Sequence, residues 1–170
     1  MSNEHTLKDL LPLLELDDFI SFDLETTGLN PDKDKITEIA ACRFINGEFT
    51  EEFTTLINPG IPIPKNITAL TGITNKMVED APSINDALPD FMKFIGSTPL
   101  VAQNINFDYN FINKILQGSN SPFSEIPLYD TLSLARGFIY FYNSFSLGSL
   151  CDYYGIKIEN AHRASVDALC

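Results

Sequence analysis

Basic residues are scarce in this sequence. Its 170 residues include 11 lysines and arginines against 23 aspartates and glutamates, which gives a formal net charge of −12. Proteins that wrap duplex DNA bind its phosphates through a face rich in lysine and arginine, so the composition argues against that class. An acidic protein can still act on nucleic acid when bound metal ions supply the positive charge.

The sequence also lacks the marks of a membrane or secreted protein. No apolar run approaches the roughly 20 residues that a membrane-spanning helix needs. The first ten residues have neither a basic start nor an apolar stretch, so no signal peptide is expected. Cys42, Cys151 and Cys170 form no CxxC motif and indicate free thiols in a reducing compartment. These absences predict a cytoplasmic protein with no membrane partner.

The order of strand-like and helix-like segments predicts the fold class. Three strands are expected at 18–24, 36–45 and 48–57, with a tight hairpin at Asn46-Gly47. Helices are then expected near 83–95, 107–117, 146–155 and 162–170, and one more begins after a cap at Asp130, with short strands at 99–102 and just before 130. A meander followed by alternating helices and strands predicts one α/β domain over residues 1–170 with a mixed sheet. Leucines at helical spacing predict an N-terminal helical extension over 1–16.

A pair of carboxylates lies at the end of the first expected strand. In a strand, residues i and i+2 face the same side, so Asp23 and Glu25 project together while Phe22 and Leu24 point into the core. Neighbouring carboxylates repel, and such a pair needs a cation or a proton. A solvated strand edge is the plain alternative. The apolar neighbours and the Thr-Thr-Gly turn that follows favour a site.

Two further segments carry weaker signals. If Asn104 opens a helix, Asp108 lies four residues later on the same face, where Asn104 can fix Asp108 or a substrate oxygen. His162 and Asp167 cannot share a helical face, because five residues turn a helix by about 500°. We therefore expect His162 in the loop before the last helix and Asp167 on its inward face. A histidine near a carboxylate suits proton transfer near neutral pH.

The four carboxylates and the histidine combine into one chemical hypothesis. Hard cations such as Mg²⁺ prefer oxygen ligands, and two such ions roughly 3.5–4 Å apart stabilise the attacking and leaving oxygens of a phosphoryl transfer. Four carboxylates at −4 balance two dications at +4. A protein with this site needs no basic groove to hold a phosphodiester.

Three motifs in this order resemble the DEDDh class of the DnaQ-like 3′–5′ exonucleases: FDLETTG at 22–28, N-x-x-F-D at 104–108 and H-x4-D at 162–167. Further similarity lies at 70–74, 130–136 and 146–150. The resemblance spans nearly the whole chain. It implies an RNase H-like fold, a mixed five-stranded sheet flanked by helices, and two catalytic divalent cations, Mg²⁺ with Mn²⁺ as a substitute.

The resemblance also implies a role for each matching residue. The metal-binding carboxylates are Asp23, Glu25, Asp108 and Asp167, and the general base that activates water is His162. The residues expected to contact the terminal nucleotide or its neighbours are Thr26 and Thr27 through their main chain, Leu29 as a wedge at the last bases, and Ile73 and Asn104. Asp130 is interpreted first as a helix cap.

The leading hypothesis is an enzyme that releases nucleoside monophosphates from 3′ ends of single-stranded DNA, working with a polymerase or another replication or repair subunit. One alternative is an RNA-directed exonuclease or oligoribonuclease on the same scaffold. Another is a non-catalytic module that binds a polymerase or helicase, but such a module has no need of four convergent carboxylates. The family's last helix normally continues beyond this point, so the helix after His162 is expected to be cut short.

Overall fold

The computed structural model describes residues 16–119, 121–139, 141–157 and 162–170. The helical extension predicted over residues 1–16 lies outside this part of the chain, except for Leu16. The strands are β1 (Asp18–Thr26), β2 (Ile36–Ile45), β3 (Glu48–Leu56), β4 (Leu100–Ala102) and β5 (Leu128–Asp130). The helices are α2 (Lys65–Thr71), α3 (Asn75–Val78), α4 (Ile84–Ile95), α5 (Asn106–Leu116), the 3-10 helix η2 (Pro122–Glu125), α6 (Thr131–Phe138), α7 (Leu147–Tyr154) and α8 (Ala164–Leu169).

The five strands form one mixed sheet in the order β3-β2-β1-β4-β5. The first three strands pair antiparallel, and β4 and β5 run parallel to β1. Asn46 and Gly47 both adopt left-handed backbone angles, with φ of 52° and 75°, as the tight turn between two antiparallel strands requires. The predicted meander, hairpin and mixed sheet are therefore confirmed.

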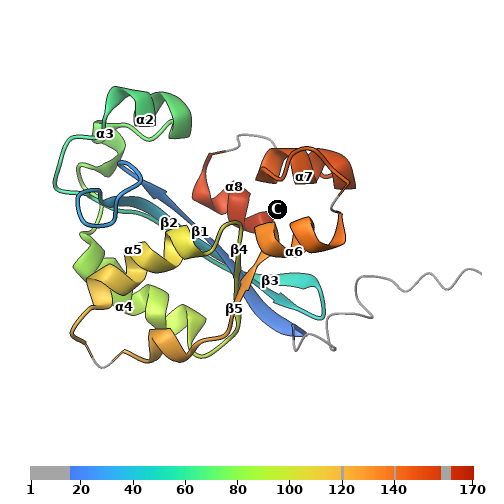
Figure 1. The fold of residues 1–170 in the computed structure, drawn as a ribbon. Helices are drawn as coiled ribbons and strands as arrows, with labels where there is room; N and C mark the ends of the chain where they lie inside the picture. The colour runs from blue at the N-terminus through green and yellow to red at the C-terminus, as the bar shows by residue number, and fades with distance from the viewer. Residues whose placement is uncertain (1–15, 120, 140, 158–161) are drawn as a thin grey trace, which may run out of the picture.

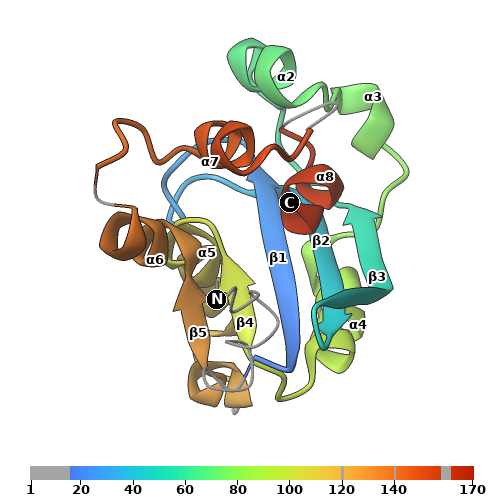
Figure 2. The same cartoon turned by 90° about the vertical axis from the view of Figure 1, so that its right-hand side faces the viewer.

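Helices cover both faces of the sheet, as Figures 1 and 2 show from two directions. On one face, Phe22 and Leu24 of β1 pack in the main core with residues of α4 and α5, and the rings of Phe22 and Phe91 lie 6.1 Å apart. On the other face, Ala40 of β2 packs against Ala164 of α8. Small side chains on both elements let α8 lie close to the sheet. The two-residue period of β1 thus sends its apolar side chains to one face and Asp23 and Glu25 to the face of α8.

The differences from the predicted elements are small. The short helices α2 and α3 fall in a stretch for which the sequence pattern predicted no element. β1 continues to Thr26, two residues beyond the predicted end, because it stays paired with β2 through an irregularity in register between Glu25 and Thr26. Within the described residues, no helix is both long and apolar enough to cross a membrane.

Candidate active site

Three of the predicted carboxylates converge where β1 ends. Asp23 and Glu25 project from β1, and Asp167 approaches from the first turn of α8. One carboxylate oxygen from each of the three lies within 4.8 Å of the other two. The predicted alignment of Asp23 with Glu25, and the predicted inward face for Asp167, are both observed.

Asp108 reaches the same strand from the opposite helical layer. β1 pairs with β4 only through Ile20 and Ser21, so the edge of β1 beyond Ser21 is open on that side. The main-chain N–H of Leu24 donates instead to Oδ1 of Asp108, at 3.1 Å. Asp108 is 2% exposed and lies in the first turn of α5. Burial and then the charge of Asp108 raise the pKa of Asp23, so the fourth carboxylate interacts with the cluster through Asp23.

The electrostatics of the site oppose four ionised carboxylates. Burial and then the charges of Asp108, Glu25 and Asp167 raise the pKa of Asp23 well above its ordinary value. Burial, with the charges of Asp167 and Glu38, raises the pKa of Glu25 to about 7. Burial also raises the pKa of Asp108 to about 8, although two backbone hydrogen bonds favour its ionised form. Burial likewise raises the pKa of Asp167. The cluster therefore favours bound protons or bound cations.

Asp167 offers a direct test of whether a metal fits this cluster. Its Oδ2 accepts a hydrogen bond from the main-chain N–H of His162 at 3.2 Å. Its Oδ1 is buried and, among the residues that the structure describes, has no hydrogen-bond partner, a costly state for a carboxylate oxygen. A cation held by Asp23, Glu25 and Asp167 would satisfy that oxygen. Because every donor is a carboxylate oxygen, the residues fit Mg²⁺ or Mn²⁺.

His162 lies in the loop immediately before α8, as predicted, and its side chain is exposed. Its φ of 67° is in the left-handed region, which non-glycine residues adopt rarely and at a cost in energy. The hydrogen bond from its N–H to Asp167 helps to hold this conformation. The main chain of His162 is thereby held against Asp167, and its side chain is open to solvent.

The turn after β1 is built around Asp34. Its carboxylate accepts the N–H of Asn30 at 2.8 Å, and Thr27 donates its own N–H to the carbonyl of Lys35. A Cβ on Gly28 would lie 2.5 Å from Asp34 Oδ2, so a larger residue there would displace the Asp34 carboxylate. Leu29 beyond it is 83% exposed. The turn presents Leu29 to solvent, as a wedge would require, whereas Thr26 and Thr27 are themselves buried.

The structure changes the setting of two residues that were predicted to contact the substrate. Asn104 has a φ of 58° and precedes α5, which begins at Asn106, so the predicted helical alignment with Asp108 is wrong. Its N–H donates to Asp130 Oδ1 at 2.8 Å, and that bond stabilises the left-handed turn. The side chain of Ile73 is fully buried with Ile63, so it packs the base of α2 and presents no surface to a substrate.

Asp130 is a helix cap, as predicted, and also joins two loops. Its carboxylate accepts the N–H groups of Leu132 and Ser133 at the start of α6, both at 3.2 Å. The same side chain accepts the N–H of Asn104. Asp130 therefore couples the start of α6 to the loop that leads into α5 and Asp108.

Glu38 and Arg163 belong to the site and were not singled out from the sequence. Glu38 of β2 lies opposite Glu25 of β1 in the sheet register and is 1% exposed. Arg163 follows His162 and forms a two-point ion pair with Glu38, with its Nη2 2.6 Å from Oε1. The available signal was a lone acidic residue inside the otherwise apolar β2 segment.

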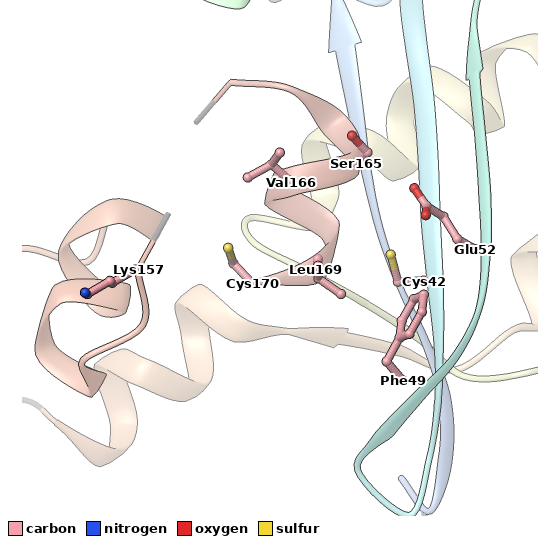
Figure 3. Close-up of a pocket in the computed structure, with 8 residues that line it drawn as sticks. All are labelled: Cys42, Phe49, Glu52, Lys157, Ser165, Val166, Leu169 and Cys170. Atoms are coloured by element: carbon pink, nitrogen blue, oxygen red, sulfur yellow. The ribbon is translucent and has the colours of Figure 1, made fainter. Parts of the chain in front are cut away.

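A separate hollow of about 420 Å³ lies farther down the face of the sheet that α8 covers (Figure 3). Its lining residues come from β2, β3, α8 and the segment after α7: Cys42, Phe49, Glu52, Lys157, Ser165, Val166, Leu169 and Cys170. Cys42 pairs in register with Ser21, whereas Glu38 pairs with Glu25. None of the predicted site residues lines this hollow.

Comparison with known proteins identifies the family. Residues 20–170 match the family described as Exonuclease (RNase_T). The chain is 41% identical over 152 residues to the PolC-type DNA polymerase III of Clostridium perfringens, covering 89% of this chain and 10% of that protein. It is 37% identical over 150 residues to the DNA polymerase III subunit epsilon of Aquifex aeolicus, covering 88% of this chain and 74% of that protein. The chain thus spans about a tenth of its PolC-type relatives.

Solved structures of exonucleases share the fold. Exonuclease X, in a complex with 5′-overhanging duplex DNA, is 28% identical with a TM-score of 0.70, covering 88% of this chain and 84% of that chain. Escherichia coli exonuclease I, in a complex with a dT13 oligonucleotide, is 20% identical with a TM-score of 0.79, covering 90% and 39%. The RNase H-like α/β fold expected from the motifs is confirmed. The chain belongs to the RNase_T exonuclease family, the DnaQ-like group that its three motifs resemble.

Proposed function

We propose that this chain is a metal-dependent 3′–5′ exonuclease that releases nucleoside monophosphates from single-stranded DNA. The observation that carries the proposal is the convergence of Asp23, Glu25 and Asp167 within 4.8 Å, with Asp108 bordering them from α5. Family membership supports hydrolysis of a nucleic acid. The four raised carboxylate pKa values mark a site that gains stability from cations.

The proposed chemistry assigns a task to each of these residues. Asp23, Glu25, Asp108 and Asp167 hold two divalent cations, Mg²⁺ or Mn²⁺. The cations, when bound, neutralise the charge that develops on the attacking and leaving oxygens. An imidazole nitrogen of His162 accepts a proton from the attacking water. The new P–O bond forms as the bond to the 3′ oxygen breaks, and that oxygen takes up a proton to become the new 3′ hydroxyl.

The surroundings of the site support binding of a strand end. An open hollow of about 440 Å³ lies between α2 and the start of α8, next to His162. It is lined by Ala69, Leu70, Thr71, Gly72, Arg163, Ser165 and Val166. We place the single strand along the α2 side of this hollow, because the guanidinium of Arg163 on the other side is engaged by Glu38. The exposed Leu29 would then lie against its last bases, with the main chain of Thr26 and Thr27 near the terminal nucleotide.

The relatives suggest the biological setting. Subunit epsilon and the PolC-type polymerases are replication proteins of bacteria, and the solved exonucleases X and I bind DNA in the complexes named above. We propose that residues 1–170 form one exonuclease domain that works in the cytoplasm with a polymerase or another replication or repair subunit.

The experiment that tests the function is digestion of 5′-labelled single-stranded DNA in the presence of Mg²⁺. We expect a ladder of products shortened one nucleotide at a time from the 3′ end, with mononucleotides released. A 3′-blocked strand and a circular strand should survive. Cutting of the circle would show an endonuclease and contradict the proposal. Digestion of RNA of the same sequence in preference to DNA would assign the site to RNA instead.

A further inference from the structure

Glu38 is a buried carboxylate that accepts three hydrogen bonds from residues at the start of α8. It accepts hydrogen bonds from Arg163 Nε at 3.1 Å and Nη2 at 2.6 Å, and from the main-chain N–H of Ala164 at 2.9 Å. Arg163 itself makes no side-chain cap to α8. A strand 125 residues earlier in the sequence thus fixes both the side chain and the main chain at the start of that helix.

Burial of this ion pair carries a desolvation cost that an apolar contact between a helix and a sheet does not have. Glu38 is 1% exposed. Its attraction to an arginine offsets the loss of hydration only when the geometry of the pair is good. Apolar residues could join α8 to the sheet, as Ala164 and Ala168 already do. A two-point arginine–carboxylate pair adds what apolar contacts lack, a fixed orientation. The arrangement therefore specifies the placement of the start of α8.

The residues so placed are those of the site. The carbonyl of Arg163 accepts the N–H groups of Val166 at 2.9 Å and Asp167 at 3.0 Å, so Asp167 is held in the turn that Arg163 begins. His162 directly precedes Arg163 and adopts its left-handed conformation with its N–H bonded to Asp167. A shift at Arg163 would therefore move both residues at once.

We propose that Glu38 and Arg163 are positioning residues that set the geometry of Asp167 and His162 and so set metal affinity and turnover. This inference rests on the proposed function for turnover, but its effect on metal affinity is independent of the substrate. Partners that orient metal ligands from outside are typically worth 10–100-fold in affinity or activity.

The decisive variant is Arg163→Met, which keeps much of the aliphatic part of the side chain and removes the guanidinium group. We expect Mn²⁺ affinity, measured by calorimetry on the folded protein, to fall by roughly 10–100-fold. The turnover number should fall by a similar factor while KM for the DNA strand stays unchanged. Arg163→Lys should recover only part of each loss, because an ammonium group cannot make the two-point hydrogen bonding of a guanidinium.

The matched control is Arg43→Met. Arg43 of β2 makes a similar two-point pair with Asp18 of β1, at 2.9 and 2.8 Å, but at the end of β1 far from the site. Its removal should leave Mn²⁺ affinity and turnover at wild-type values. If Arg163→Met does not fold, Glu38→Gln replaces it as the test variant, because its amide oxygen can still accept the N–H of Ala164. The double variant Glu38→Gln/Arg163→Met should be no worse than Arg163→Met alone.

Wild-type Mn²⁺ affinity and turnover in a folded Arg163→Met protein of lowered melting temperature would overturn the proposal and leave a purely structural pair. A raised KM with unchanged turnover would also overturn it, because Arg163 would then contact the substrate. If the wild-type chain digests no nucleic acid but Arg163→Met loses Mn²⁺ affinity as stated, the positioning role stands and the exonuclease function fails.

Discussion

Acidic side chains at the two ends of β1 have pKa values shifted in opposite directions. At its start, Asp18 pairs with Arg43, and this partner holds the pKa of Asp18 below its ordinary value. At its end, burial and neighbouring carboxylates raise the pKa of Glu25 to about 7 and that of Asp23 well above normal. The strand and the chemical group are the same. The difference lies in whether the protein supplies its own cation.

Each end has one arginine, but the two arginines serve different carboxylates. Arg43 neutralises Asp18 itself. Arg163 is engaged by Glu38, so the four carboxylates of the site keep a formal charge of −4 when ionised. A site that keeps this charge beside a buried core depends on external cations. The predictions below test that contrast, beginning with the largest effect.

Replacing Asp23 by asparagine should have the largest effect on activity. It removes a charged ligand at the centre of the cluster, so turnover should fall by more than the roughly 10–100-fold that loss of an outer partner costs. Without metal, the same change should raise the melting temperature, because the buried Asp23 carboxyl must either take up a proton or stay ionised next to Asp108 and Glu25, and an amide does neither. Digestion assays and melting curves in a chelator measure the two effects. A destabilised Asp23→Asn protein that still digests DNA would contradict the assignment.

His162→Ala should lower turnover by roughly 10²–10⁴, the usual contribution of a positioned acid–base group. Metal-induced stabilisation should remain, since His162 contacts Asp167 through its main-chain N–H, which alanine retains. The comparison with Asp23→Asn separates a base from a ligand. A folded His162→Ala protein that digests at the wild-type rate would show that the histidine serves only the entry to α8.

The stability of the metal-free protein should fall as pH rises. The folded pKa values of Glu25 and Asp108, about 7 and about 8, are above their ordinary values of 4.5 and 3.8. Their contribution to stability is therefore complete below those ordinary values and is lost as pH rises through the folded values. Melting temperatures in a chelator should decline between about pH 4 and about pH 8 and level off above that range. Saturating Mg²⁺ should reduce the decline, and a flat metal-free profile would contradict the raised pKa values.

Asp18→Asn should have the smallest effect. The pair of Asp18 and Arg43 is partly exposed, with side-chain exposures of 41% and 29%, and such pairs contribute about 0.2–1 kcal/mol. Its loss should lower the free energy of unfolding by that amount and leave Mg²⁺-dependent digestion unchanged. Urea unfolding curves measure the change. A loss of digestion would show that the two ends of β1 are coupled.

The sequence predicted the elements whose patterns are local and strong. The alternation in β1 placed Asp23 and Glu25 on one face, and Asn46-Gly47 predicted its hairpin from backbone preference alone. The order of three motifs located five residues from distant parts of the chain. Spacing alone could not have shown that Asp108 takes the free N–H of Leu24, because that depends on where β4 leaves β1.

The errors share one physical cause, which is tertiary contact. A helix opened by Asn104 would align it with Asp108, but the hydrogen bond from the Asn104 N–H to Asp130 of β5 fixes Asn104 in a left-handed turn before α5. Ile73 lies in the 70–74 segment that resembles the family and was expected to contact the substrate, yet packing beneath α2 buries it completely. The pair of Glu38 and Arg163 joins residues 125 positions apart. No local pattern specifies such pairings.

The most direct test of the central claim is the melting temperature of the wild-type chain with and without millimolar Mg²⁺. Ions that bind only the folded state stabilise it by mass action, by about 2.7 kcal/mol at a hundred times Kd. We predict a clear rise for the wild-type chain and none for Asp23→Asn. An unchanged melting temperature of the wild-type chain would contradict a metal site formed by Asp23, Glu25 and Asp167.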